Sequence, residues 1–265
     1  MVRKKKNRKL KPGVKLSFIL ILLFLLIYVW RNPLVSKKTP KYYLDALNQE
    51  MIRQTSYTLK TLSEEFIKDY PENKDIYMAY YCLGVFYSYR DEHKNSIENL
   101  TRSLKLNRIN SHVTSKALSY RALEYIKIKD YKDAISDINK AIRLISDINE
   151  LSFLYYEKAF AYNRLHEFNQ ALASINKAKS ICRDNRLLAS LFLEEAYSLQ
   201  NQHKFKLAKM IYKEVLSKFA SYEFAVNIAN DSLKKIEKVQ KAIDSTNNEK
   251  KKLEELLNND NKLYY

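Results

Sequence analysis

The sequence predicts an all-α protein built from stacked antiparallel helix pairs. Apolar and small residues recur three and four positions apart, as on one face of a helix, most clearly in Tyr131 to Leu144 (YKDAISDINKAIRL). Only two Gly and four Pro occur in 265 residues, which disfavours sheets built on glycine turns. The helical segment also has copies at a fixed period, the mark of stacked units. Equivalent positions are Leu59, Ser96, Ala134, Ala171 and Ala208, at intervals of 37, 38, 37 and 37 residues.

An uncharged apolar run, Leu16 to Trp30 (LSFILILLFLLIYVW), comes first in the chain. As a helix it spans about 22 Å, less than the ~30 Å bilayer core, but Lys15 and Arg31 can snorkel and the bilayer can thin. We expect an uncleaved transmembrane signal anchor over residues 16–30. A cleaved signal peptide fits the length and the basic start, but no small-residue cleavage site follows Trp30. A buried core helix lacks support because the run has no polar face.

Basic residues flank this run unequally, with eight before it and four between Arg31 and Lys41. The positive-inside rule therefore places the N-terminus in the cytoplasm and the rest of the chain outside it. This predicts a single-pass protein of the cell envelope, bacterial in architecture. The basic head, residues 1–15, is expected to bind anionic lipid headgroups, and residues 31–41 form a tether.

The formal net charge of +17 is concentrated at the N-terminus. Residues 1–41 carry twelve of the 47 basic residues and no acidic one, so residues 42–265 hold 35 basic and 30 acidic residues. A nucleic-acid-binding domain would cluster its basic residues on the folded part. No nucleic-acid partner is therefore expected.

From residue 42 the helical periodicity is continuous, and Pro71 interrupts it. Five pairs are predicted, followed by a long helix from Tyr222 to about Ile243 whose Ala225, Ile228, Leu233, Ile236 and Val239 face inward. A turn at residues 245–248 and a short charged helix, Glu249 to Leu257, complete the chain. The predicted pairs are Tyr42–Gln54 with Ser56–Asp69, Asp75–Tyr89 with Lys94–Leu106, Thr114–Ile128 with Tyr131–Leu144, Glu150–Leu165 with Glu167–Cys182, and Arg186–Asn201 with Lys204–Phe219.

The pattern of each unit resembles the tetratricopeptide repeat: a small residue, an aromatic three later, an alanine nine after that, then apolar and small positions. Ala122, Tyr125, Ala134, Ile138 and Ala141 carry the resemblance, and the unit after them matches equally well. The period departs from the family's 34 residues. The resemblance implies a TPR-like right-handed superhelix over residues 42–222, closed by a capping helix and charged tail, 223–265. Its units are expected at about 40–73, 77–110, 115–148, 152–185 and 189–222.

Small residues are predicted to let helices approach closely, both within units and between them. A larger side chain there would overpack the contact between the helices, at a cost of about 1–3 kcal/mol of stability. The repeat-packing positions are Gly84, Ala122, Ala134, Ala141, Ala159, Ala171, Ala178, Ala196 and Ala208.

In the resembled family, ligands lie against the first helix of each unit, in a concave groove. Family members that clamp acidic chaperone termini use a Lys and an Asn four residues apart, and no such pair occurs at these positions here. An aromatic, apolar groove suits an apolar or amphipathic peptide. Alternatively, a terminal helix of the chain itself fills the groove. The predicted groove residues are Tyr81, Val85, Leu123, Tyr156, Phe160, Asn163, Leu193 and Tyr197.

Catalytic and cofactor motifs are not found in the sequence. Gly13 and Gly84 alone cannot form a P-loop or a dinucleotide fingerprint, and no HExxH or CxxC occurs. His93, His166 and His203 recur near the turn inside a unit and are expected to be exposed. Cys82 and Cys182 lie two units apart, too far for a disulfide. We therefore predict no enzyme activity, no cofactor and no metal.

These observations predict a membrane-anchored adaptor or scaffold that binds protein outside the cytoplasm, in envelope protein export or assembly. Two alternatives remain open: a chaperone-like holdase for exported clients, and a scaffold that faces the cytoplasm.

Overall fold

The computed structural model describes residues 38–54, 56–107 and 110–260, and every regular element in these ranges is a helix. The predicted all-α class is confirmed for this part of the chain. The elements are α2 (Pro40–Glu50), the short 3₁₀ helix η1 (Met51–Arg53), α3 (Tyr57–Asp69), α4 (Tyr77–Ser88), α5 (His93–Leu106), α6 (Ser111–Lys127), α7 (Tyr131–Ile142), α8 (Ile148–Arg164), α9 (Phe168–Ile181), α10 (Asn185–Asn201), α11 (Phe205–Lys218) and α12 (Glu223–Asp260).

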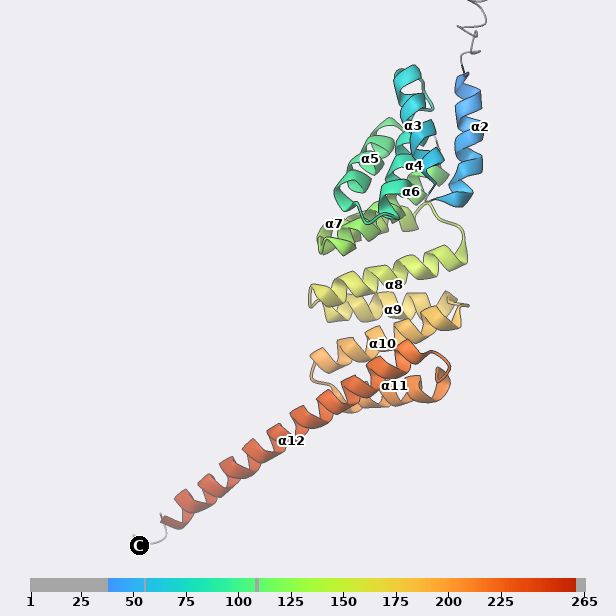
Figure 1. Ribbon diagram of the computed structural model, residues 1–265. Coiled ribbons are helices and arrows are strands. Elements are labelled where there is room, and N and C mark those ends of the chain that lie inside the picture. The colour runs from blue at the N-terminus through green and yellow to red at the C-terminus, as the bar shows by residue number, and fades with distance from the viewer. Residues whose placement is uncertain (1–37, 55, 108–109, 261–265) are drawn as a thin grey trace, which may run out of the picture.

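The helices form a stack of antiparallel pairs in chain order, α2 with α3 through α10 with α11 (Figure 1). Each pair packs on the next, and the first helices of neighbouring pairs also touch one another. Helix axes turn along the stack, so the assembly is superhelical (Figure 1). Helix α12 packs on α10 and α11 and closes the C-terminal end.

Several first helices begin earlier than the periodicity predicts, because a polar side chain caps each start. Asn110, Asp147 and Asp184 accept hydrogen bonds from backbone N–H groups in the first turns of α6, α8 and α10. The apolar pattern alone does not show these turns, since they precede the first buried residue.

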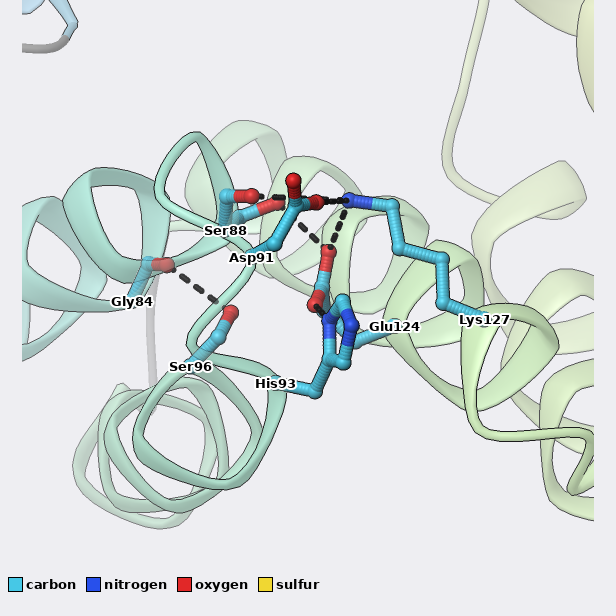
Figure 2. Close-up of polar contacts among 7 residues, drawn as sticks. All are labelled: Gly84, Ser88, Asp91, His93, Ser96, Glu124 and Lys127. Carbon is cyan, nitrogen blue, oxygen red and sulfur yellow. Dashed lines mark hydrogen bonds and ion pairs between the residues drawn. The ribbon is translucent and has the colours of Figure 1, made fainter.

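The small residues predicted at the helix contacts are all buried. Gly84 shows most directly why size matters there. A Cβ atom at Gly84 would lie 2.5 Å from Leu100 Cγ and 3.2 Å from the Leu100 backbone nitrogen. The hydroxyl of Ser96 also donates a 2.8 Å hydrogen bond to the Gly84 carbonyl (Figure 2). A side chain of α5 is thus bonded directly to the backbone of α4.

The C-terminal prediction is wrong in two respects. Helix α12 continues from Glu223 to Asp260 without the predicted turn at 245–248 and without a separate helix at 249–257. The polar run there contains no Gly or Pro, and the Thr246 hydroxyl bonds back to the Ala242 carbonyl at 3.0 Å, which keeps it within the helix. Of the predicted inward residues, Ile228 and Val239 are 48% and 44% exposed, and Ala229 is buried instead.

Helix α12 does not fill the concave groove. Its packing partners are α10 and α11, and its C-terminal half projects away from the stack (Figure 1). The alternative in which a terminal helix of this chain occupies the groove is therefore not supported for α12.

The turn inside each of the four pairs from α4–α5 to α10–α11 uses a left-handed residue that is not glycine. Asp91, Lys129, His166 and His203 have φ of 56°, 66°, 60° and 59°. A side chain is disfavoured in this conformation by about 1–2 kcal/mol.

We expect Lys129→Gly to raise the free energy of unfolding by about 0.5–1 kcal/mol, the gain being reduced by the extra freedom of glycine in the unfolded chain. Urea unfolding measures this change in the free energy of unfolding. Lys129→Ala is the control, because it removes the same charge but keeps Cβ. Equal stability of the two variants would contradict the prediction.

The predicted transmembrane segment, residues 16–30, the basic head and the tether up to residue 37 lie outside the described residues. In the part of the chain that the structure describes, no helix combines the length and the apolar character needed to cross a bilayer.

Candidate functional site on the first helices

The structure places the eight predicted groove residues in two different environments. Tyr81, Val85, Asn163 and Leu193 are buried, with 8% exposure or less. Leu123, Tyr156, Phe160 and Tyr197 are partly exposed. Val85, Asn163 and Leu193 therefore support the groove from inside the stack, which differs from the prediction. Tyr81 is also buried but still contributes to the wall of a hollow on this face.

Helix geometry explains part of the difference, although Val85 has the same register position as Leu123 and is buried. At about 100° per residue, the residues that point directly away from the second helix are spaced four, three and four apart. In α6 these are Lys116, Tyr120, Leu123 and Lys127, and in α8 they are Phe153, Glu157, Phe160 and Arg164. Positions such as those of Tyr81 and Asn163 are rotated toward a neighbouring first helix, where the seam buries them. The predicted register thus missed Tyr89, Tyr120, Glu157, Arg164 and Glu194, although the same spacing rule could have found them.

Two adjacent hollows lie along this face. The first has a volume of about 490 Å³ and lies between α2, α4 and α6, where Leu44, Met78 and Tyr81 contribute to its wall. The second has a volume of about 390 Å³ and lies between α4, α6 and α8. Its wall includes Tyr89, Lys116, Tyr120, Leu123 and Phe153. Lys116 lines both hollows and is ion-paired with Glu150.

Tyrosines form the floor between these hollows. The ring of Tyr120 lies 6.3 Å from that of Tyr81 and 6.4 Å from that of Tyr89, centroid to centroid. Burial is the main cause that raises the pKa of both Tyr81 and Tyr120, so these phenols stay protonated at neutral pH. The floor is consequently apolar with hydroxyl groups at its edge, a surface suited to a peptide that carries both apolar side chains and backbone amides.

The C-terminal part of the face combines aromatic rings with carboxylates. The Arg164 guanidinium lies 4.3 Å from the ring centroid of Phe160 and 4.9 Å from that of Tyr197. It also pairs with Glu194 at 3.7 Å. Burial and, second, the neighbouring Glu194 raise the pKa of Glu157 to about 7.

A polar cluster in the seam beneath the face joins α4, α5 and α6 (Figure 2). Glu124 is fully buried and accepts hydrogen bonds from the Ser88 hydroxyl at 2.7 Å and from Lys127 at 3.1 Å. Its other oxygen lies 2.7 Å from His93 Nδ1. Lys127 also reaches Asp91, at 3.2 Å. The predicted exposure of His93 is therefore wrong, whereas His166 and His203 are exposed at their turns.

The histidines differ because His93 lies two residues beyond the left-handed turn residue. In later units that position holds Tyr131, Phe168 and Phe205, which follow Lys129, His166 and His203. An equivalent seam contact joins α8 and α10, where the Ser198 hydroxyl donates to the Asn163 side chain at 2.7 Å. Specific polar contacts thus join neighbouring first helices at two places in the stack, between α4 and α6 and between α8 and α10.

No family model and no curated protein matches the sequence. Solved structures do match in fold. A tetratricopeptide repeat protein from Parabacteroides merdae aligns with a TM-score of 0.59 and 13% identity over 72% of this chain and 71% of that one. YrrB, described as a TPR protein with an unusual peptide-binding site, aligns with a TM-score of 0.59 and 12% identity over 76% and 95%. MamA from Desulfovibrio magneticus aligns with a TM-score of 0.56 and 15% identity over 69% and 97%.

The described chain has the tetratricopeptide-repeat fold. At these identities the likeness establishes the repeat architecture alone. Neighbouring first helices contact one another along the stack, and the two hollows lie on the face that they form; we call it the concave face. The first helices are α2, α4, α6, α8 and α10.

Within the described residues, no group of three or more His, Cys, Asp or Glu side chains could hold a metal ion. Cys82 is a buried free thiol, and burial raises its pKa, while Cys182 is a partly exposed free thiol.

Proposed function

We propose that this protein is a repeat scaffold that binds a peptide segment of another protein along the concave face of its first helices. The observation that carries the proposal is the pair of adjacent hollows with aromatic and aliphatic walls, contributed by four consecutive first helices. Phe153 is 38% exposed and Tyr89 48% exposed on this face, so large apolar groups remain uncovered where a ligand can bury them.

The ligand class follows from the shape and chemistry of the face. Together the two hollows extend over helices α2 to α8, which suits an extended or helical peptide better than a compact small molecule. Aromatic side chains in such positions are frequent binding hot spots. We therefore propose an apolar or amphipathic peptide as the ligand.

The double substitution Leu123→Ala with Phe153→Ala tests the groove. An array of synthetic apolar decapeptides serves as the probe, and fluorescence polarisation then measures the best binders. We expect affinity to fall at least tenfold, because truncating two hot-spot side chains costs more than about 1.4 kcal/mol. The matched control is Leu207→Ala with Met210→Ala on α11, which removes two exposed apolar side chains outside the concave face. Equal affinity of the groove variant and the control, with intact helicity, would contradict the proposal.

We propose further that residues 16–30 anchor the protein in a membrane and that the repeats lie outside the cytoplasm, in envelope protein export or assembly. The support is the charge asymmetry around the apolar run. Protease added to intact cells should degrade the repeats. Protection would favour the alternative of a cytoplasm-facing scaffold.

A chaperone-like holdase differs from an adaptor in that it would suppress the aggregation of many unrelated unfolded proteins.

A further inference from the structure

The concave face changes character at α8 and α10. Glu157, Phe160 and Arg164 of α8 lie on this face beside Glu194 and Tyr197 of α10, which occupy the positions one unit later. We call these five residues the acid–aromatic subsite. It lies C-terminal to the two hollows, so a peptide that occupies the hollows and continues along the stack would reach it.

The subsite already binds one cation. Arg164 lies over the rings of Phe160 and Tyr197 and pairs with Glu194. Glu194 is further fixed by a 2.7 Å hydrogen bond from the Asn163 amide. The contacts of Arg164 show that a guanidinium fits against these rings and carboxylates.

The charges of the subsite do not balance. It holds two carboxylates and one guanidinium, and Glu157 makes no hydrogen bond or ion pair within the described part of the chain. Burial and the proximity of Glu194 both disfavour the ionised form of Glu157, which is consistent with an uncompensated negative charge. A ligand that covers Glu157 without compensating it would bury that charge alone, at high cost.

We infer that the acid–aromatic subsite accepts a lysine or arginine side chain of the bound peptide, with its cationic group at Glu157. The inference rests on the proposed function of the groove and specifies its ligand as an apolar peptide with a basic residue near one end. Glu150, another partly exposed carboxylate of the face, is already paired with Lys116, which points to Glu157 as the position where a ligand's charge is needed.

The test uses a peptide array in which each apolar decapeptide carries Arg, Lys, Gln or Glu at a single position, scanned along the peptide. Binding is measured at pH 8, above the pKa of Glu157. We expect the wild-type chain to bind the Arg and Lys peptides about tenfold more tightly than the Gln peptides, as for a charge-assisted hydrogen bond. Glu157→Gln should reduce this preference to less than twofold, because the variant has no carboxylate at this position for a basic side chain to compensate. Glu98→Gln, an exposed carboxylate on α5, is the control and should keep the full preference.

Three outcomes would overturn the inference. Equal binding of Arg and Gln peptides by the wild type, with loss of both in the Leu123→Ala/Phe153→Ala variant, removes the basic subsite but retains the proposed groove. A preference for basic peptides that survives in Glu157→Gln places the cation elsewhere. Absence of binding to any peptide, or binding that the groove variant does not weaken, overturns the groove and the subsite together.

Discussion

Glu124→Ala is expected to lower the free energy of unfolding by about 3 kcal/mol. Glu124 is fully buried and receives contacts from Ser88, His93 and Lys127, from three different helices (Figure 2). Removing the carboxylate leaves these donors without their shared acceptor and opens a space in the seam between α4 and α6. Breaking a buried charge cluster by deleting one member typically costs about 3–5 kcal/mol, and partial exposure of Lys127 moderates the value here.

Chemical denaturation monitored by circular dichroism measures the change. Glu98→Ala provides the matched control, since Glu98 also pairs with a cation but is 59% exposed on α5, and its loss should cost less than about 0.5 kcal/mol. Because each repeat contacts only its neighbours, hydrogen exchange should increase mainly in α4, α5 and α6. A variant as stable as the control would show that the cluster contributes little to the seam.

Glu157→Gln is expected to stabilise the protein at pH 8 and to have little effect near pH 4.5. The pKa of Glu157 is raised from an ordinary value near 4.5 to about 7, first by burial and then by Glu194. The folded state therefore holds the proton more tightly than the unfolded state, so stability falls as pH rises from about 4.5 to about 7. Above pH 7 the penalty is fully present. At about 1.4 kcal/mol per pKa unit, reduced for partial exposure, it amounts to about 2 kcal/mol.

Urea unfolding of the wild-type protein and of the Glu157→Gln variant, at several pH values between 4.5 and 8, tests this prediction. The difference in unfolding free energy between Glu157→Gln and wild type should grow with pH and level off above about 7. The Glu98→Gln variant controls for a general change in net charge and should follow the wild-type curve. A difference that is the same at all pH values would mean that Glu157 is not the titrating group.

Much of the fold can be predicted from periodicity. The recurrence of Ala134, Ala171 and Ala208 predicts both the helix pairs and the burial of these residues, because a small side chain at a fixed period is only useful where neighbours meet closely. The length of α12 could not be predicted in this way. The polar composition of residues 245–248 predicts a turn, yet the segment continues as a helix because it contains no Gly or Pro.

The concave face is predicted less well than the helix pairs. Spacing along a helix identifies a face only to within about one residue on either side. Tyr81 and Leu193 were placed on the surface, whereas the adjoining first helices bury them. The partnership of His93 with Glu124 was also hidden, since 31 residues separate them and only the stacking of units brings them together.

The sequence by itself determined that this chain forms paired helices at a period near 37 residues, because local helical spacing and small packing residues are encoded within each unit. Only the tertiary structure decided which side chains remain on the concave face and which polar groups are buried between units. It also decided that Glu157 has no hydrogen bond or ion pair among the residues that the structure describes. These depend on how neighbouring units rotate against one another, and that rotation arises from contacts between residues more than thirty positions apart.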